Sequence, residues 1–245
     1  MIISLTAFLI LCVCPHVSAV PFPTLQIGLG DTNDPKQVSM LIEIIALLTI
    51  LSLAPAILIM MTSFTRLAVT FSFLRQALGT HQMPPNQIVI GLSLFLTFFI
   101  MTPVWQKINQ NAIKPYLAEE ISQEDAFKKA MEPVREFMLK QTRKTDLALF
   151  LDMSGSPKLH SPSEVSTSVL IPAFIVSELK TSFIIGFVLY IPFLIIDMVV
   201  ASILLSMGMM MLPPVMISLP FKLMLFVLVD GWNLIVGSMV KSFTG

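Results

Sequence analysis

Few side chains in this sequence are of the types that catalyse reactions or hold metal ions. Both cysteines, Cys12 and Cys14, lie at the extreme N-terminus, and His81 and His160 fall in predicted loops far apart in the chain. No phosphate-binding, dinucleotide-binding or nucleophile motif accompanies them. The sequence therefore predicts a protein that is not an enzyme and that needs neither a cofactor nor a metal.

A methionine run near the C-terminus is a candidate for a different kind of chemistry. It lies in an almost unbroken apolar stretch and consists of Met209, Met210 and Met211, flanked by the helix-breaking residues Gly208, Pro213 and Pro214. Thioether side chains are flexible, so they reshape around whatever contacts them. Two interpretations stay open here: a gap-filling core, or a pliable constriction. A Cu(I) site is disfavoured because consecutive helical residues point around the whole circumference.

Charged residues also occur in the apolar C-terminal half, where charges are costly and usually face protein or water. They are Glu178, Lys180, Asp197, Lys222 and Asp230. Lys222 and Asp230 lie eight residues apart, about two helical turns, which is too far for a direct pair on one helix. We predict that Lys222 instead pairs with Asp197 across a helical hairpin. Both a structural pair and a proton relay fit this pattern.

The composition indicates which elements must position these groups. Of the 245 residues, 55% are hydrophobic and 12% are charged, against about 25% charged in soluble domains. The 15 basic and 15 acidic residues leave no net charge that would attract nucleic acid. The sequence predicts an all-α membrane protein made of helical hairpins with a small α-helical insert.

Hydropathy and charge divide the chain into nine segments. They are a cleaved signal peptide at 1–19, a leader at 20–37, a first apolar helix at 38–65, a basic connector at 66–87, a second apolar helix at 88–105, an insert at 106–168, a third apolar helix at 169–197, the methionine segment at 198–221 and a C-terminal apolar helix at 222–245. The sequence Val17-Ser18-Ala19 is typical of a cleavage site. An uncleaved first helix remains the alternative.

The connector orients the chain in the membrane. It carries Arg66 and Arg75 but no acidic residue, so the positive-inside rule places it on the cytoplasmic side. The insert is then expected to face the periplasm. Its main helix opens at Ser122 and has one apolar stripe, which consists of Phe127, Met131, Val134 and Met138. We expect this stripe to dock on the rest of the protein or on a neighbouring copy, because about 70 residues make a marginal core.

Several long motifs give the chain a resemblance to a known family. They are Met61–Arg66, Leu74–Thr80, Pro84–Gln87, Ser177–Lys180, Ile191–Asp197 and Leu219–Trp232. Together they resemble the FliP family of flagellar export-gate proteins over nearly all of the chain after the signal peptide. The sequence departs from the family pattern after Lys180, where Ser182 and Ile184 replace the usual residues.

This resemblance implies a non-enzymatic subunit of the type III secretion export gate in the flagellar basal body of the bacterial inner membrane. Members of this family form homo-oligomers and assemble with FliQ and FliR, beside FlhB and FlhA, into a conical helical pore for unfolded flagellar proteins. Carried onto matching positions, the family's methionine gasket falls on Met209, Met210 and Met211.

A rival interpretation is a secondary transporter or ion channel for a small solute. It would use Asp197, Lys222 and Asp230 as coupling groups at a broken helix. Inverted repeats would support it, but the two halves of the sequence show no convincing similarity. Loss of motility with unaltered solute uptake would separate the two interpretations.

Overall fold

The structure is a computed structural model that describes residues 35–80, 83–155, 165–209 and 211–244. Its regular elements are α2 (Pro35–Met60), α3 (Phe64–Ala77), α4 (Asn86–Ile108), the π-helix η1 (Asn109–Ile113), α5 (Lys114–Leu117), α6 (Gln123–Gln141), α7 (Lys144–Met153), α8 (Thr167–Ser206), α9 (Pro214–Leu228) and α10 (Gly231–Thr244). These described ranges contain no strand, so the predicted all-α class is confirmed. The predicted signal peptide, all but the end of the leader, and His81 and His160 lie outside the described residues.

The chain divides into two units, residues 1–50 and 51–245. In the described part of the first unit, α2 carries exposed apolar side chains, among them Ile45 and Leu47. The second unit begins within the same helix. There α2 ends at Met60, before the predicted limit of 65, because the Thr62 hydroxyl bonds to the Ile59 carbonyl oxygen at 2.7 Å and the chain turns.

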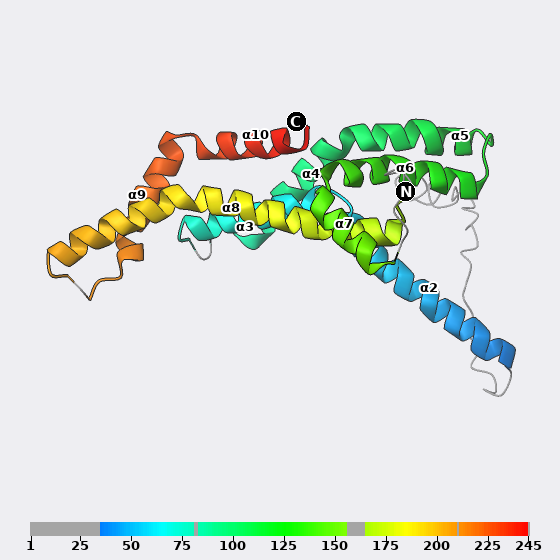
Figure 1. Ribbon diagram of the computed structural model, residues 1–245, viewed down its shortest axis with the longest axis horizontal. Coiled ribbons are helices and arrows are strands. Elements are labelled where there is room, and N and C mark those ends of the chain that lie inside the picture. Colours follow the sequence, from blue (N-terminus) through cyan, green and yellow to red (C-terminus); the bar gives the residue numbers. More distant parts are fainter. Residues whose placement is uncertain (1–34, 81–82, 156–164, 210, 245) are drawn as a thin grey trace, which may run out of the picture. The chain divides into compact units, whose positions relative to one another are not determined.

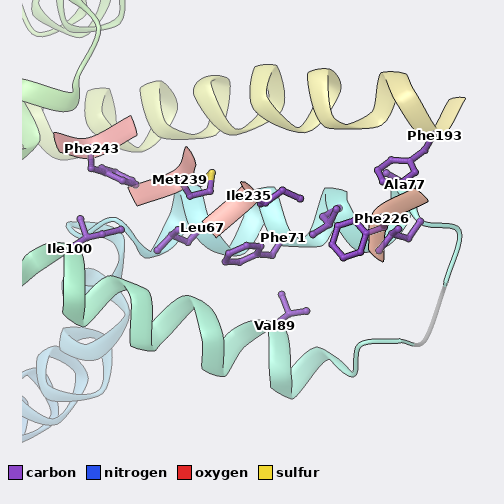
Figure 2. Packing of buried hydrophobic residues seen from close by; sticks show 12 residues of the cluster. Leu67, Phe71, Ala77, Val89, Ile100, Phe193, Phe226, Ile235, Met239 and Phe243 are labelled. Carbon is purple, nitrogen blue, oxygen red and sulfur yellow. The ribbon is translucent and has the colours of Figure 1, made fainter. Parts of the chain in front are cut away.

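The second unit is built around α3, which runs alongside α8 (Figure 1) and packs against both α8 and α4. Figure 2 shows its side chains gathered with those of α4, α8, α9 and α10. Close approach of α3 and α8 depends on Gly186, since a Cβ atom there would lie 2.6 Å from the Phe73 ring. Phe73 in turn contacts the Phe183 ring edge-on, with centroids 5.3 Å apart.

The predicted basic connector, residues 66–87, is largely a helix that packs in the core. Most of it is α3, whose Leu67 and Phe71 are core residues. Arg66 is buried as well, and Arg75 is half-buried. Hydropathy missed this helix because α3 mixes apolar side chains with Thr, Ser, Arg and Gln, of which Arg66 and Thr70 are buried inside the protein. The charge of Arg66 is matched by an acid within the chain, Glu178.

The described part of the predicted insert, residues 106–155 and 165–168, is largely helical and docks on the rest of its unit. Ser122 caps α6 as expected, because its hydroxyl oxygen accepts a hydrogen bond from the Asp125 amide at 3.1 Å. Three members of the apolar stripe, Met131, Val134 and Met138, pack against α8 and its neighbours. The fourth, Phe127, is 69% exposed. The expected docking is therefore seen for Met131, Val134 and Met138 but not for Phe127.

Among the residues that the structure describes, helices long and apolar enough to cross a membrane are fewer than the four predicted. Two single helices qualify there, one running through residues 86–117 and the other α8. The pair α9 and α10 would count as a third, although its axis bends by 64°, and the apolar stretch of α2, Leu41–Ile57, is shorter. The predicted boundary between residues 197 and 198 falls inside the 40-residue α8, where the Asp197 carboxylate has a cationic partner.

Candidate functional site

The methionine run forms an exposed turn between α8 and α9. Met209 is 44% exposed and Met211 is 96% exposed, whereas Met210 lies outside the described residues. The adjacent Met207, which the sequence interpretation left out, is 65% exposed. These positions do not fill gaps in the core of the chain. The fold of one chain therefore does not support the first of the two interpretations, a gap-filling core.

Gly208 and the two prolines build this turn by ordinary helix-ending geometry. Gly208 has a φ of +73°, the left-handed conformation that glycine adopts without a Cβ clash. The amide of Gly208 bonds to the Leu205 carbonyl oxygen at 3.1 Å, and that of Met209 to the Leu204 carbonyl oxygen at 3.0 Å. This is the Schellman arrangement, which satisfies the last carbonyls of a helix. Pro213 precedes α9 and Pro214 opens it, where the missing amide hydrogen costs nothing.

A buried ion pair holds α8 and α9 together below the turn. The Lys222 ammonium nitrogen lies 2.5 Å from Asp197 Oδ2, as predicted. The Lys222 side chain is 2% exposed and that of Asp197 is 24% exposed. The Ser218 hydroxyl also donates to the Asp197 carboxylate. The pair therefore fixes the register of the two helices that carry the methionine turn.

The same lysine reaches α3, which brings a third element to the base of the hairpin. Its ammonium group donates to the Ala77 carbonyl oxygen at 3.4 Å. Ala77 is the last residue of α3, where the helix dipole is negative and favours a cation. Beside it, a Cβ atom added to Gly79 would lie 3.7 Å from the same nitrogen. Lys222 thus connects the hairpin to the core helix.

A second buried pair joins Arg66 of α3 to Glu178 of α8. The Arg66 Nε donates to Glu178 Oε2 at 2.9 Å, and a terminal nitrogen donates to the other carboxylate oxygen. Such a two-pronged contact suits the planar guanidinium. Arg66 also donates to the Gln141 side-chain oxygen at 3.0 Å and to the Ser242 carbonyl oxygen at 3.2 Å. Its guanidinium carbon lies 3.9 Å from the centre of the Phe243 ring, a cation–π distance.

The sequence interpretation named both members of this pair but did not join them. One signal was available, because Arg66 follows 22 uncharged residues and Glu178 interrupts an apolar helix. Two isolated charges of opposite sign in apolar segments are natural partners, since neither can be buried alone. The link to Gln141 and Phe243 carries no comparable signal in the sequence.

The remaining predicted charges lie apart from these pairs. Lys180 is exposed on α8, and Asp230 is exposed in the turn between α9 and α10. Asp230 accepts a hydrogen bond from the Asn233 side chain at 3.1 Å and has a φ of +49°. The three groups required by the transporter interpretation are therefore not gathered in one site. Within the described ranges, no three His, Cys, Asp or Glu side chains are grouped so as to hold a metal ion.

Comparison with known proteins identifies the family to which this fold and these pairs belong. The sequence model of the FliP family matches residues 47–239. The chain is 56% identical over 217 residues to the flagellar biosynthetic protein FliP of Bacillus subtilis, covering 89% of this chain and 98% of that protein. The chain belongs to the FliP family. FliP of Aquifex aeolicus is 56% identical over 228 residues, which cover 92% of this chain and 93% of the relative. FliP of Pectobacterium carotovorum is 57% identical over 202 residues, covering 82% and 78%.

Membership of the FliP family makes this chain a component of the flagellar export apparatus, a structural and transport role. The motifs that carry the resemblance are also the ones that meet in the buried pairs. Arg66 ends the first motif, and Glu178 lies in the fourth. Asp197 ends the fifth and Lys222 lies in the sixth. The family pattern therefore follows the contacts that hold α3, α8 and α9 together.

Proposed function

We propose that this chain is a pore-forming subunit of the flagellar type III export gate. In this proposal it assembles with further copies of itself and with FliQ and FliR, next to FlhB and FlhA. The complex lies in the bacterial inner membrane, and residues 106–168 face the periplasm. Unfolded flagellar proteins pass through its centre, and the methionine turn closes that passage when it is empty.

The exposed methionine turn on a firmly held hairpin is the observation that supports this proposal. A seal needs flexible side chains at its surface and a rigid backbone, the mount, that holds them in position. The thioethers of Met209 and Met211 supply the soft surface, because they contact any passing sequence without directional hydrogen bonds. The mount is the Schellman turn at Gly208 together with the Lys222–Asp197 pair. Several copies with their turns at one level would close a pore against ions yet yield to an extended chain.

The apolar surface of the chain also favours an assembly or a lipid environment. Large aromatic side chains on the outer face of α4, including Phe95, Phe98 and Phe99, are 63–78% exposed. On α8, Phe187 is 70% exposed. Apolar patches of this kind are covered by other subunits or by membrane in working proteins.

The rival proposal, a small-solute transporter, has weaker support from the geometry. The ammonium group of Lys222 is already satisfied by Asp197 and the Ala77 carbonyl oxygen. Asp230 lies eight residues further along, beyond the end of α9 at Leu228, and the helical part alone rises about 9 Å from Lys222. A substrate-coupling site built on all three charges would require them to face one cavity.

The test of this proposal replaces the methionines by alanine together, as Met209→Ala, Met210→Ala and Met211→Ala. Because alanine lacks the flexible thioether, we expect the assembled complex to persist while its membrane becomes leaky to small ions. Assembly is measured by the size of the complex extracted from membranes, and leakage by ion conductance in planar bilayers. The control is Met153→Ala, a methionine that is 74% exposed on α7, which should leave conductance unchanged. Unaltered conductance in the triple variant would count against the seal.

A further inference from the structure

The apolar C-terminal part of the chain contains six charged residues, three of each sign, and four of them are satisfied within the chain. They are Glu178, Lys180, Asp197, Lys222, Asp230 and Lys241. Glu178 pairs with Arg66 and Asp197 with Lys222, and Lys241 has interactions of its own in the fold. For Lys180 and Asp230, the described residues provide no oppositely charged partner. These two charges are of opposite sign.

Lys180 lies in a shallow, wide-open apolar groove along one face of α8. The groove has a volume of about 480 Å³ and is lined by Val176, Leu179, Lys180, Phe183, Ile184 and Phe187. Glu178 cannot serve as its partner, because two residues along a helix turn the side chain by about 200° and the Glu178 carboxylate is already held by Arg66. If another molecule covers this groove, the ammonium group of Lys180 loses its water, which is costly unless the covering molecule supplies an anion.

Asp230 is an anion among exposed apolar side chains, at the corner between α9 and α10. The axis of the chain bends by 64° between α9 and α10, and Asp230 lies in the bend. The flanking Val227 and Leu228 are 74% and 75% exposed. The corner is well defined, since a Cβ atom on Gly231 would lie 2.4 Å from the Phe226 ring, which itself contacts Trp232 edge-on at 5.4 Å.

We infer that Lys180 of one copy pairs with Asp230 of a second copy, whose α9–α10 corner enters the groove on α8. This inference rests on the proposed function, because it requires the chain to assemble with copies of itself. Charge complementarity identifies a second copy as the occupant of the groove. Burying either charge alone is costly, whereas burying the two together, with the apolar side chains around them, satisfies both. An anionic lipid headgroup would neutralise Lys180 but leave Asp230 without a cation.

The geometry of this contact sets the type of assembly. The groove and the corner are different surfaces of the chain, so the contact is heterologous: each copy offers a groove to one neighbour and a corner to the other. Heterologous contacts repeat until they close a ring or continue as a helix, whereas a two-fold contact stops at a dimer. A ring or helical turn of copies would bring their methionine turns to equivalent positions.

Chemical cross-linking in intact membranes tests this pairing. Cys12 and Cys14 are the cysteines of the chain, so they are first replaced by serine. Lys180→Cys and Asp230→Cys are then introduced together and treated with a bifunctional thiol reagent about 8 Å long, because an ion pair separates Cα atoms further than a disulfide allows. We expect a ladder of covalent dimers, trimers and larger species. Co-expression of the two single variants should give dimers without a ladder, and each single variant alone should give monomers.

Matched controls separate failure of this inference from failure of the proposed function. The pair Phe127→Cys with Asp230→Cys uses an exposed residue of α6 and should give no ladder. The size of the extracted complex is measured in parallel. If copies assemble but the Lys180 and Asp230 positions do not cross-link, the inference is wrong and the proposed function stands. If the chain stays monomeric, both are wrong.

Charge reversal supplies the second measurement. We expect Lys180→Asp and Asp230→Lys each to lower the amount of assembled complex by about tenfold, because like charges then meet in an apolar interface. The double variant should restore it to within about twofold of the original level, since the pair is re-formed in reverse. Lys128→Glu, in an exposed pair of α6, should have no effect on assembly. Failure of the double reversal to restore assembly would overturn the pairing.

Discussion

The Arg66–Glu178 pair and the Lys222–Asp197 pair hold different parts of the molecule and are enclosed to different degrees. The side chains of the first are 4% and 0% exposed, and those of the second are 2% and 24% exposed. The first joins α3 and α8 and reaches Gln141 and Ser242, whereas the second holds the α8–α9 hairpin and contacts α3 at its last residue, Ala77. This contrast indicates that the first pair fixes the core and the second sets the position of the methionine turn.

Breaking the fully enclosed pair should have the largest effect. Arg66→Ala or Glu178→Ala leaves one buried charge without its partner, which costs about 3–5 kcal/mol of the free energy of unfolding. We expect little folded protein in the membrane for either variant, measured by protease resistance and by unfolding in detergent. The double variant Arg66→Leu with Glu178→Leu should lose less than either single variant, because no charge remains buried. Equal loss would show that the other contacts of Arg66 dominate.

Breaking the hairpin pair should have a smaller and more local effect. In Asp197→Ala, Lys222 keeps the Ala77 carbonyl oxygen as a partner, so we expect a loss of about 2–3 kcal/mol. Hydrogen exchange should rise in α9 and leave α3 protected. The reversed pair, Asp197→Lys with Lys222→Asp, should recover assembly that either reversal alone abolishes. Uniform exchange over both helices would contradict the separation of the two regions.

A matched glycine pair sharpens the contrast between tight and open packing. Gly186→Ala drives a Cβ atom to 2.6 Å from the Phe73 ring, which overpacks the α3–α8 contact and should cost about 1–2 kcal/mol. Gly91→Ala, on α4, meets no atom within 4 Å and should be neutral or slightly stabilising, since alanine favours helix. Thermal unfolding of the two purified variants compares them directly. A lower melting temperature for Gly91→Ala would contradict this assignment.

The smallest effect is expected at the methionine turn itself. Gly208→Ala places a Cβ atom in the left-handed conformation at a φ of +73°, a strain of about 1 kcal/mol that the exposed turn relieves by opening locally. Gly208→Asn should cost less, because asparagine tolerates that conformation. Nothing packs against the site within 4 Å, so global stability should change little while protease cleavage near the turn rises. Cleavage that is the same in both variants would argue against the Schellman geometry.

The sequence alone was enough to predict the elements that depend on a local pattern of residues. The apolar runs gave α4 and α8, Ser122 gave the start of α6, and the sign and spacing of Lys222 and Asp197 gave their pairing. It missed that α3 is a core helix, because a short helix with polar residues on it gains its stability from packing that a window of hydropathy does not see. Close approach of α3 and α8 through Ser182 and Gly186 was also missed. The spacing of these two small residues, four apart, is a signal for such contacts.

The candidate site was predicted in its residues but not in its arrangement. The sequence showed the methionine run, and beside it Gly208 and the prolines, which are residue types that end and begin helices. It did not reveal that Lys222 also reaches the end of α3, because that contact joins residues far apart in the sequence. Long-range contacts of this kind depend on the complete packing of the fold.

The proposed export path through the methionine turn is tested most directly by trapping a substrate inside it. Met209→Cys and Met211→Cys, made in the chain with Cys12 and Cys14 replaced by serine, are expressed with an export substrate that carries one cysteine and a folded domain that stalls it. Disulfide formation should join the stalled substrate to both positions and not to Tyr116→Cys, an exposed position on α5. Adducts at position 116 with none at 209 or 211 would contradict the account.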